Sequence, residues 1–249
     1  MKITVEHLSY TAGKKQILRD VNAVFEGQKI YGIIGPNGSG KTTLLRHLYR
    51  QLPSRGSIFM DGIDISGIAA KVYARKAAVM MQHQDLFESE LRVRDVIRTG
   101  RYPYKSFLSH YNRQDEEIIT EIMRRNALLE YENRQLCTLS GGELQRVMLC
   151  RAMAQQPEVI ILDEPTNHLD IRYKLELMKT LRHFEGLVIM TLHDLNLAAS
   201  YCSELYVLQD GRVAAHGLPE EICCPELLGN IFQAEIPVYK EGEKIFVGI

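Results

Sequence analysis

The stretch "QKIYGIIGPNGSGKTTLLRHLYR", residues 28–50, joins an apolar strand, a glycine-rich loop and a helix without any linker between them. Its middle, "GPNGSGKT" at 35–42, matches the pattern G-x-x-x-x-G-K-[ST] at every fixed position. That pattern binds phosphate only where a strand leads into the loop and a helix leaves it, and both flanks are present here. The sequence therefore predicts a nucleotide-binding phosphate loop.

Each residue type in this loop has a chemical task. Gly35, Gly38 and Gly40 lack a Cβ, so backbone N–H groups can close around phosphate oxygens. The helix that follows points its positive end at the same anion. Lys41 supplies a charge near the β and γ phosphates, and the Thr42 hydroxyl can ligate Mg²⁺. The remaining loop residues expected to contact the nucleotide are Pro36, Asn37, Ser39 and Thr43.

Acidic, imidazole and amide side chains follow other predicted strands. "VIILDEP" ends in Asp163, which suits a Mg²⁺ shell, and Glu164, which can polarise an attacking water as a general base. His193 follows the next strand, and strand ends in a parallel sheet share one edge, so this histidine can reach a γ phosphate. Gln82 also follows a strand and is a candidate contact for Mg²⁺ or water. On position alone, a structural role is the more common one for a histidine after a strand, and the functional interpretation of Gln82 is weaker still.

Predicted strands alternate with predicted helices along most of the chain. We expect strands at 28–35, 76–82, 158–164 and 186–194, a strand and a turn at 56–65, a hairpin at 204–217, and an edge strand at 2–10. Residues 85–151 have helical spacing with no evident strand. The pattern predicts an α/β fold of the P-loop (RecA-like) type: a mostly parallel sheet with antiparallel edge strands and an inserted α-helical subdomain. We expect one domain over 1–249, with a core at 1–84 and 152–222, the helical subdomain at 85–151 and a C-terminal appendix at 223–249.

Composition excludes several classes of protein. The net charge of −1 argues against a nucleic-acid binder that relies on a broad basic face, so no nucleic-acid partner is expected. No apolar run approaches the roughly 18 residues of a membrane span, and the first residues lack a signal-peptide core. The five cysteines form no C-x-x-C pair and are expected to be reduced. These features predict a chain that stays in the cytosol.

Four motifs together resemble a known family. The phosphate loop, "LSGGE" at 139–143, "VIILDEPTNHLD" at 159–170 and "TLHD" at 191–194 make the chain similar to the nucleotide-binding subunits of ABC transporters. They occur in the family's order and at its usual spacing, and the resemblance covers nearly the whole chain. It implies ATP as the nucleotide, Mg²⁺ as its metal, and ATP hydrolysis as the reaction.

The resemblance also assigns roles that isolated motifs leave open. It makes Gln82 the lid glutamine and His193 the switch histidine. It places residues 167–170 in a loop that faces a partner subunit, with Asp170 at the nucleotide site. Tyr10 matches the aromatic residue that stacks on adenine, a contact worth roughly 1–3 kcal/mol.

A second glycine-rich stretch, "LSGGELQRV" at 139–147, is explained by the same resemblance. In this family two copies pack head to tail, and residues matching Ser140, Gly141, Gly142 and Glu143 of one copy cap the nucleotide held by the other. Small residues at the start of a helix offer N–H donors to an anion. ATP would then join two copies of the chain, and hydrolysis would release them.

A narrower resemblance concerns the cargo. "LRVRDVIRTGRYPY" at 91–104 and "TLHDLNLAASYC" at 191–202 are similar to the importer branch that handles iron–siderophore complexes, haem and cobalamin. This branch implies an integral-membrane permease as partner and, indirectly, a substrate-binding protein. It places the chain at the cytoplasmic face of the cell membrane.

Two alternatives compete with an importer subunit. The first is a soluble ABC ATPase that works without a permease. Those that act in DNA repair carry long coiled coils or zinc modules, which this compact chain lacks. An ATPase of iron–sulfur assembly, in contrast, fits the length of the chain. The "GRYPY" segment at 100–104 speaks against the latter. An exporter half is the other, and it would carry a fused membrane domain that this sequence does not contain.

Overall fold

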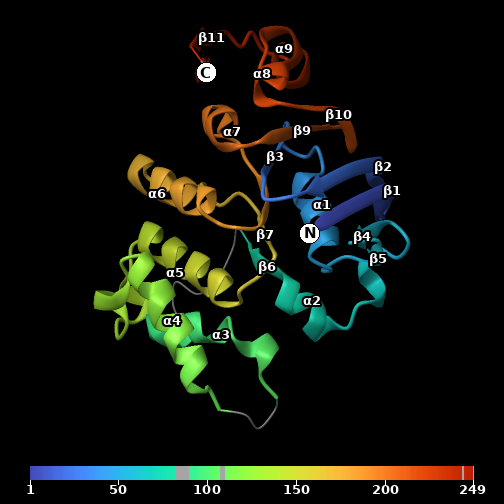
Figure 1. Cartoon of the computed structure of the whole chain (residues 1–249). Coiled ribbons are helices and arrows are strands. Elements are labelled where there is room, and N and C mark those ends of the chain that lie inside the picture. The colour runs from blue at the N-terminus through green and yellow to red at the C-terminus, as the bar shows by residue number, and fades with distance from the viewer. Residues whose placement is uncertain (82–89, 107–109, 243, 249) are drawn as a thin grey trace.

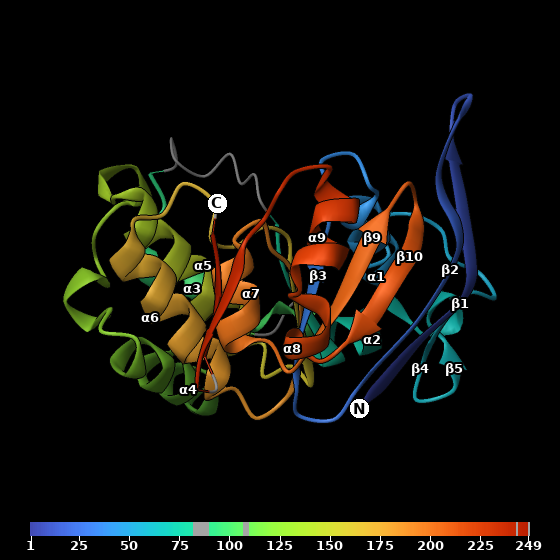
Figure 2. The same ribbon diagram turned by 90° about the horizontal axis from the view of Figure 1, so that it is seen from above.

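The computed structural model describes residues 1–81, 90–106, 110–242 and 244–248. Within them, a six-stranded sheet in the order β10-β9-β3-β8-β7-β6 forms the centre, and a four-stranded sheet in the order β2-β1-β4-β5 lies beside it (Figure 1). Seen from above, helices α3, α4 and α5 gather at one end of the molecule and the β1–β2 hairpin lies at the other (Figure 2).

The strands and helices have the following bounds. The central strands are β3 (Ile30–Ile34), β6 (Ala77–Met80), β7 (Val159–Leu162), β8 (Leu187–Thr191), β9 (Glu204–Gln209) and β10 (Arg212–Gly217). The other strands are β1 (Lys2–Ala12), β2 (Lys15–Glu26), β4 (Ile58–Met60), β5 (Ile63–Asp64), β11 (Val238–Glu241) and β12 (Lys244–Val247). The helices are α1 (Lys41–Leu48), α2 (Ala70–Lys76), α3 (Val93–Thr99), α4 (Arg113–Arg125), α5 (Gly141–Ala154), α6 (Ile171–Arg182), α7 (Leu195–Tyr201), α8 (Pro219–Ile222) and α9 (Pro225–Phe232).

The central sheet is parallel except at its β10 edge. Strands β6, β7, β8, β3 and β9 pair in parallel with their neighbours, whereas β10 pairs with β9 in the antiparallel sense. The prediction of a mostly parallel sheet with antiparallel strands at an edge is therefore confirmed. The hairpin predicted at 204–217 is β9–β10, which turns at Asp210 and Gly211, both with positive φ.

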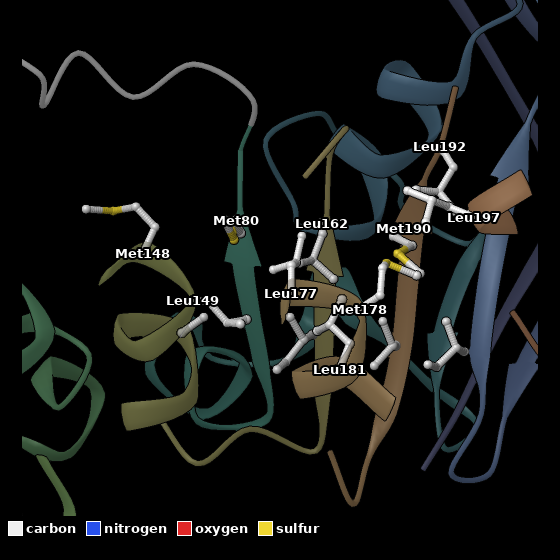
Figure 3. Close-up of a cluster of buried hydrophobic side chains, with 14 of the residues drawn as sticks. Met80, Met148, Leu149, Leu162, Leu177, Met178, Leu181, Met190, Leu192 and Leu197 are labelled. Carbon is white, nitrogen blue, oxygen red and sulfur yellow. The ribbon is translucent and has the colours of Figure 1, made fainter. Parts of the chain in front are cut away.

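The central sheet is buried on both faces, because its strands have no polar alternation. Along β7, Ile160 and Leu162 pack into one cluster, while Val159 and Ile161 pack into another on the opposite face. Helices α5 and α6 cover the first face, where methionine and leucine side chains fill the space between helix and sheet (Figure 3). Helix α1 joins the second cluster, between the central sheet and the four-stranded sheet. Polar side chains can therefore lie together only where the strands end, beyond the buried faces of the sheet.

The expectation that residues 2–10 form an edge strand is wrong. Strand β1 lies between β2 and β4 and pairs with both, and β2 is the edge. The sequence pattern hid β2 because the β1–β2 pair is irregular: register shifts break the period of two, and His7 and Asp20 have positive φ. Buried residues of β2 are consequently three apart at Leu18 and Val21 instead of two.

The segment that suggested the importer branch, 100–104, fastens the helical group to the core. Arg101 is buried; its Nε donates to Asp115 Oδ1 of α4 at 3.0 Å and its Nη1 donates to the Ala154 carbonyl at 2.9 Å. The Arg101 guanidinium also lies 4.0 Å from the centre of the Tyr104 ring. A Cβ on Gly100 would lie 2.2 Å from the Arg151 carbonyl oxygen, so this position requires glycine.

The C-terminal segment is tied to the core by buried side chains. Cys223, Leu228 and Val247 are buried in the same cluster as α5 and α6. Asn196 of α7 donates to the Val247 carbonyl at 2.9 Å and accepts from the Val247 N–H at 2.8 Å, so one amide side chain holds β12 as a strand would. Among the residues that the structure describes, no helix is both long and apolar enough to cross a membrane.

Burial acts to raise the pKa of Asp115, but hydrogen bonds from Lys105, the Asn112 N–H and Arg101 outweigh it and hold that pKa below its ordinary 3.8. A carboxyl group with a lowered pKa in the folded state stabilises the fold above its ordinary pKa. That contribution is lost as the pH falls through the lowered value.

We predict that Arg101→Met lowers the free energy of unfolding by about 3 kcal/mol, because it leaves a buried carboxylate with one partner fewer. The loss should be constant between pH 8 and about pH 5 and shrink as the pH falls below the ordinary carboxyl pKa and through the lowered pKa of Asp115. Urea unfolding across this pH range measures it. Arg113→Met is the control, since its pair with Glu117 is exposed and worth less than about 0.5 kcal/mol. Equal losses in the two variants would contradict a stabilising role for the buried Arg101–Asp115 pair.

Candidate active site

The parallel order of β3, β8 and β7 brings three distant segments to one sheet edge. The loop that begins at Gly35 leaves β3, Asp163 and Glu164 follow β7, and His193 follows β8. These strands are adjacent, so their carboxyl ends open on a common crevice. The predicted meeting of the phosphate loop with these side chains rests on this arrangement.

Two glycines of the loop occupy positions that disfavour any residue with a Cβ. Gly35 has φ 143°, and a Cβ there would lie 2.0 Å from the Leu208 carbonyl oxygen of β9. Gly40 has φ 104°, and its Cβ would lie 2.8 Å from Leu18 Cδ2 of β2. The loop is thus pressed between the two sheets. The N–H groups at the start of α1, which follows Gly40, are left facing the crevice without a capping side chain.

Lys41 is buried at the floor of the loop, with only 5% of its surface exposed. Its Nζ donates to the carbonyl oxygens of Gly35 at 2.8 Å and Pro36 at 3.0 Å. Burial lowers the pKa of Lys41, and the carboxylates of Glu164 and Asp163 act in the opposite direction. Phosphate oxygens entering the loop would replace weak carbonyl partners with anionic ones, which favours the charged lysine.

Asp163 is held by two threonine hydroxyls. Thr42 Oγ1 donates to Asp163 Oδ1 at 3.1 Å, and Thr191 Oγ1 donates to the same oxygen at 2.8 Å. Burial raises the pKa of Asp163, against the hydrogen bonds from Thr191 and Thr42. A hydroxyl and a carboxylate side by side are the hard oxygen ligands that Mg²⁺ prefers, so Thr42 and Asp163 fit a magnesium ion.

Glu164 is fixed from three sides. Its N–H donates to Thr191 Oγ1 at 2.7 Å, and its Oε1 lies 2.6 Å from His193 Nε2. Asn167 Nδ2 donates to the other carboxylate oxygen, Oε2. The carboxylate therefore has a defined direction at the crevice. Sequence reasoning missed Thr191 and this role of Asn167; the available signal was a threonine at the end of the strand next to β7.

A cleft of about 240 Å³ lies over the loop, and Glu164 is part of its wall. Its other lining residues are Lys15, Ile17, Asn37, Gly38, Gly40, Lys41, Thr42 and Thr43. Lys15 and Ile17, on β2, were not predicted. Tyr10 is not among the lining residues: its ring packs edge-on against His47 of α1, with 4.8 Å between ring centres. The stacking role of Tyr10 stays a prediction, and Gln82 lies outside the described residues.

The second glycine stretch lies on another element and does not line this cleft. Ser140 caps α5: its Oγ accepts from the Glu143 N–H at 3.3 Å, and its own N–H donates to Glu143 Oε2 at 2.7 Å. Ser140 and Gly141 are exposed, and a Cβ on Gly141 would meet no described atom within 4 Å. Asp170 caps α6 by accepting from the Tyr173 N–H at 3.0 Å.

Comparison with known proteins identifies the family. The model of the ABC transporter family matches residues 18–167. The petrobactin import ATP-binding protein FpuC of Bacillus anthracis is 37% identical over 98% of this chain and 91% of its own. The ferric enterobactin transport ATP-binding protein FepC of Escherichia coli (strain K12) is 34% identical over 91% of this chain and 85% of its own.

A solved structure shows the same fold. The ADP conformation of MJ1267, an ATP-binding cassette of an ABC transporter, superposes with a TM-score of 0.82 at 22% identity, covering 94% of this chain and 100% of that one. The P-loop α/β fold predicted from the sequence is confirmed. The chain belongs to the ABC transporter family, as one of its ATP-binding subunits.

Proposed function

We propose that this chain hydrolyses ATP at the cleft over the phosphate loop and that two copies use this reaction to power import of an iron complex or of cobalamin. The observation that supports it most directly is the meeting of Lys41, Asp163 and Glu164 at one sheet edge, where a charge for the phosphates, a metal ligand and a base lie together. The relatives supply the transport class.

ATP would enter with its phosphates in the loop. The N–H groups from Gly38 to Thr43 and the Lys41 ammonium would bind the β and γ phosphates, and the positive end of α1 would favour their charge. The adenine ring of ATP would lie toward the β1–β2 hairpin, beside the cleft residues Lys15 and Ile17. We retain Tyr10 as the residue that stacks on it. When bound, Mg²⁺, held by Thr42 and Asp163, would neutralise charge on the phosphates.

Glu164 is suited to accept the proton of the attacking water. Its carboxylate cannot rotate freely, because His193 and Asn167 each hold one oxygen. The Thr191 hydroxyl bonds to both Asp163 and the Glu164 N–H, so it sets the position of the base relative to the metal ligand. His193, partly exposed at the crevice, can transfer its bond from Glu164 to a γ phosphate. We keep Gln82 as a further contact of metal and water.

The second glycine stretch, residues 140–142, supports a head-to-tail pair. These residues lie at the start of α5, where Ser140 and Gly141 are exposed, and this element does not line the cleft of their own chain. A second copy can bring them over the γ phosphate, with Glu143 and Asp170 close to the same junction. ATP would then close the pair, and hydrolysis would open it.

FpuC and FepC act, by name, in petrobactin import and ferric enterobactin transport, which favours an importer over a soluble ATPase of the iron–sulfur assembly kind. We therefore propose an integral-membrane permease as partner, a substrate-binding protein acting through it, and a position at the cytoplasmic face of the membrane.

The role of Glu164 is tested by Glu164→Gln. ATP should still bind, because the phosphate loop is unchanged, but hydrolysis should slow by about 10²–10⁴-fold, the usual cost of losing a general base. Phosphate release and nucleotide binding are measured on the same preparation. Glu158→Gln is the control, since Glu158 precedes the same strand at its other end and pairs with Lys76. Turnover of Glu164→Gln near that of the control would remove Glu164 from this role.

The head-to-tail pair is tested by association. Glu164→Gln should form a dimer with ATP and Mg²⁺ but not with ADP, because only ATP carries the γ phosphate that the second glycine stretch would contact. Sedimentation measures this directly. Ser140→Arg in the same background should remain monomeric while its own phosphate loop still binds ATP.

Mixing variants then shows which copy supplies the second glycine stretch. A pair made from a Lys41→Ala subunit and a Ser140→Arg subunit collects both lesions in one composite site and leaves the other intact. Nucleotide occlusion should return at one site per pair. If every chain used its own Ser140, mixing would rescue nothing, and the head-to-tail arrangement would be wrong.

The cargo class is tested by reconstitution with the permease. We expect ATP-driven uptake of a ferric siderophore, haem or cobalamin into vesicles, and no uptake when the ATPase subunit carries Glu164→Gln. Uptake is followed with labelled iron and labelled cobalamin in parallel. A subunit that hydrolyses ATP, fails to purify with any permease and drives no uptake would favour the soluble alternative.

A further inference from the structure

The ring of Tyr173, on α6, covers the second glycine stretch within the same chain. Gly142 is buried, and a Cβ on it would lie 2.3 Å from Tyr173 Cδ2 and 2.4 Å from Tyr173 Cγ. The ring therefore occupies the space that a side chain at Gly142 would need. The glycine at this position is explained by close packing as much as by N–H donation to a phosphate.

Gln145 and Arg146 make three further contacts that join the first turns of α5 to the segment after β7. Gln145 Nε2 donates to the Pro165 carbonyl at 2.7 Å, directly after Glu164. Arg146 Nη2 pairs with Glu176 Oε2 at 3.1 Å, and the Arg146 guanidinium lies 5.3 Å from the centre of the Tyr173 ring. The start of α5 is thus fastened to the segment at Pro165, at Tyr173 and at Glu176.

Tyr173 is also connected to Glu164, through Asp170 and the loop that contains Asn167. Its N–H donates to Asp170 Oδ1 at 3.0 Å, which caps α6, and the loop before Asp170 contains Asn167, whose amide holds Glu164. Glu164 and the second glycine stretch are consequently linked within one chain through Asn167, Asp170 and Tyr173. In a head-to-tail pair these two ends would serve different nucleotides.

We propose that Tyr173 is a positioning residue that holds Ser140–Gly142 in place for the nucleotide bound by the other copy. This inference rests on the head-to-tail pair proposed above. Tyr173 acts on the site to which its own chain contributes the second glycine stretch, while Glu164 of that chain acts on the other site. The link gives each chain a rigid connection between the two nucleotides of a pair.

The surroundings of the ring make this testable. Tyr173 is half-buried and borders a cavity of about 290 Å³ between α5 and α6, whose lining includes Leu149, Leu169 and Leu177. A ring beside a cavity is not locked into the core on all sides. Its removal should therefore release the second glycine stretch without unfolding the chain.

The first experiment compares Tyr173→Ala, Tyr173→Phe and Leu175→Ala, each in the Glu164→Gln background. ATP affinity of the monomer should change by less than about twofold in all three, because the phosphate loop is untouched. ATP-driven association should weaken by about tenfold in Tyr173→Ala alone, a typical size for coupling between sites. Leu175 is the control, because it lies on the same helix, is partly exposed and lines a different cavity.

Three results of this experiment would overturn the proposal. Tyr173→Ala could associate like its parent, or Tyr173→Phe could be damaged as much as Tyr173→Ala, which would assign the effect to the hydroxyl instead of the ring over Gly142. Loss of monomer ATP binding would place Tyr173 in its own site. If Tyr173→Ala does not fold, Tyr173→Leu keeps apolar bulk without the flat ring and is judged by the same criteria.

The second experiment identifies the nucleotide on which Tyr173 acts. A Lys41→Ala subunit is mixed with a Tyr173→Ala subunit, both in the Glu164→Gln background, and retained ATP per pair is measured. If Tyr173 acts through Ser140–Gly142, both lesions fall in one composite site and occlusion returns at the other. If it acts on its own chain's nucleotide, each site carries one lesion and nothing returns, which overturns the proposal.

The Glu164→Gln parent shows whether a negative result refutes the head-to-tail pair or only the role of Tyr173. A Glu164→Gln protein that does not associate with ATP would refute the head-to-tail pair and, with it, the role of Tyr173. A parent that associates normally while the Tyr173 variants also do so would refute only the role of Tyr173.

Discussion

Parallel pairing of β3 with β8 and of β8 with β7 is the constraint on which the site depends. The phosphate loop, Thr191 and the Asp163–Glu164 pair lie far apart in the sequence and meet only because these three strands are adjacent and run in the same direction. Burial of the sheet on both faces favours one register for each strand pair, since a slip by one residue would exchange the two sets of buried side chains. The Thr191 hydroxyl then joins the strand ends by bonding to Asp163 and to the Glu164 N–H.

Glu164, the proposed general base, occupies a strained backbone position that this network maintains. Glu164 has φ 50°, in the left-handed region that costs a residue with a Cβ about 1 kcal/mol or more. Its N–H bond to Thr191 and its carboxylate bonds to His193 and Asn167 offset that cost. The strain turns the chain sharply after β7, so that the Asp163 side chain stays buried at the strand end while the Glu164 side chain reaches the cleft. Two adjacent carboxylates can thus have different tasks.

The sequence predicts what depends on residue identity and misses what depends on geometry. Lys41, Asp163 and Glu164 could be found because their chemistry requires those side chains next to a strand. Thr191 could not, since a strand-ending threonine is common and only its distance to Asp163 gives it a role. The fold was predictable from alternating apolar strands and helices, except that β2 was not predicted and β1 was expected at the sheet edge. Bulges in this pair break the period of two on which such predictions depend. Ile17 was missed as a cleft residue for the same reason, because it lies on β2, a strand that the sequence pattern did not reveal.

In the second glycine stretch, Gly141 and Gly142 satisfy two different structural constraints. Gly141 is exposed, and a Cβ there would meet no described atom within 4 Å, whereas the Tyr173 ring occupies the space that a Cβ on Gly142 would need. If this motif is interpreted only as an anion site, both Gly141 and Gly142 are assigned to anion binding. The packing assigns the second to contact with α6 and thereby with the loop that holds Glu164. In the head-to-tail pair proposed above, the contacts that join Glu164 to the second glycine stretch of the same chain would couple closure around one nucleotide to hydrolysis of the other.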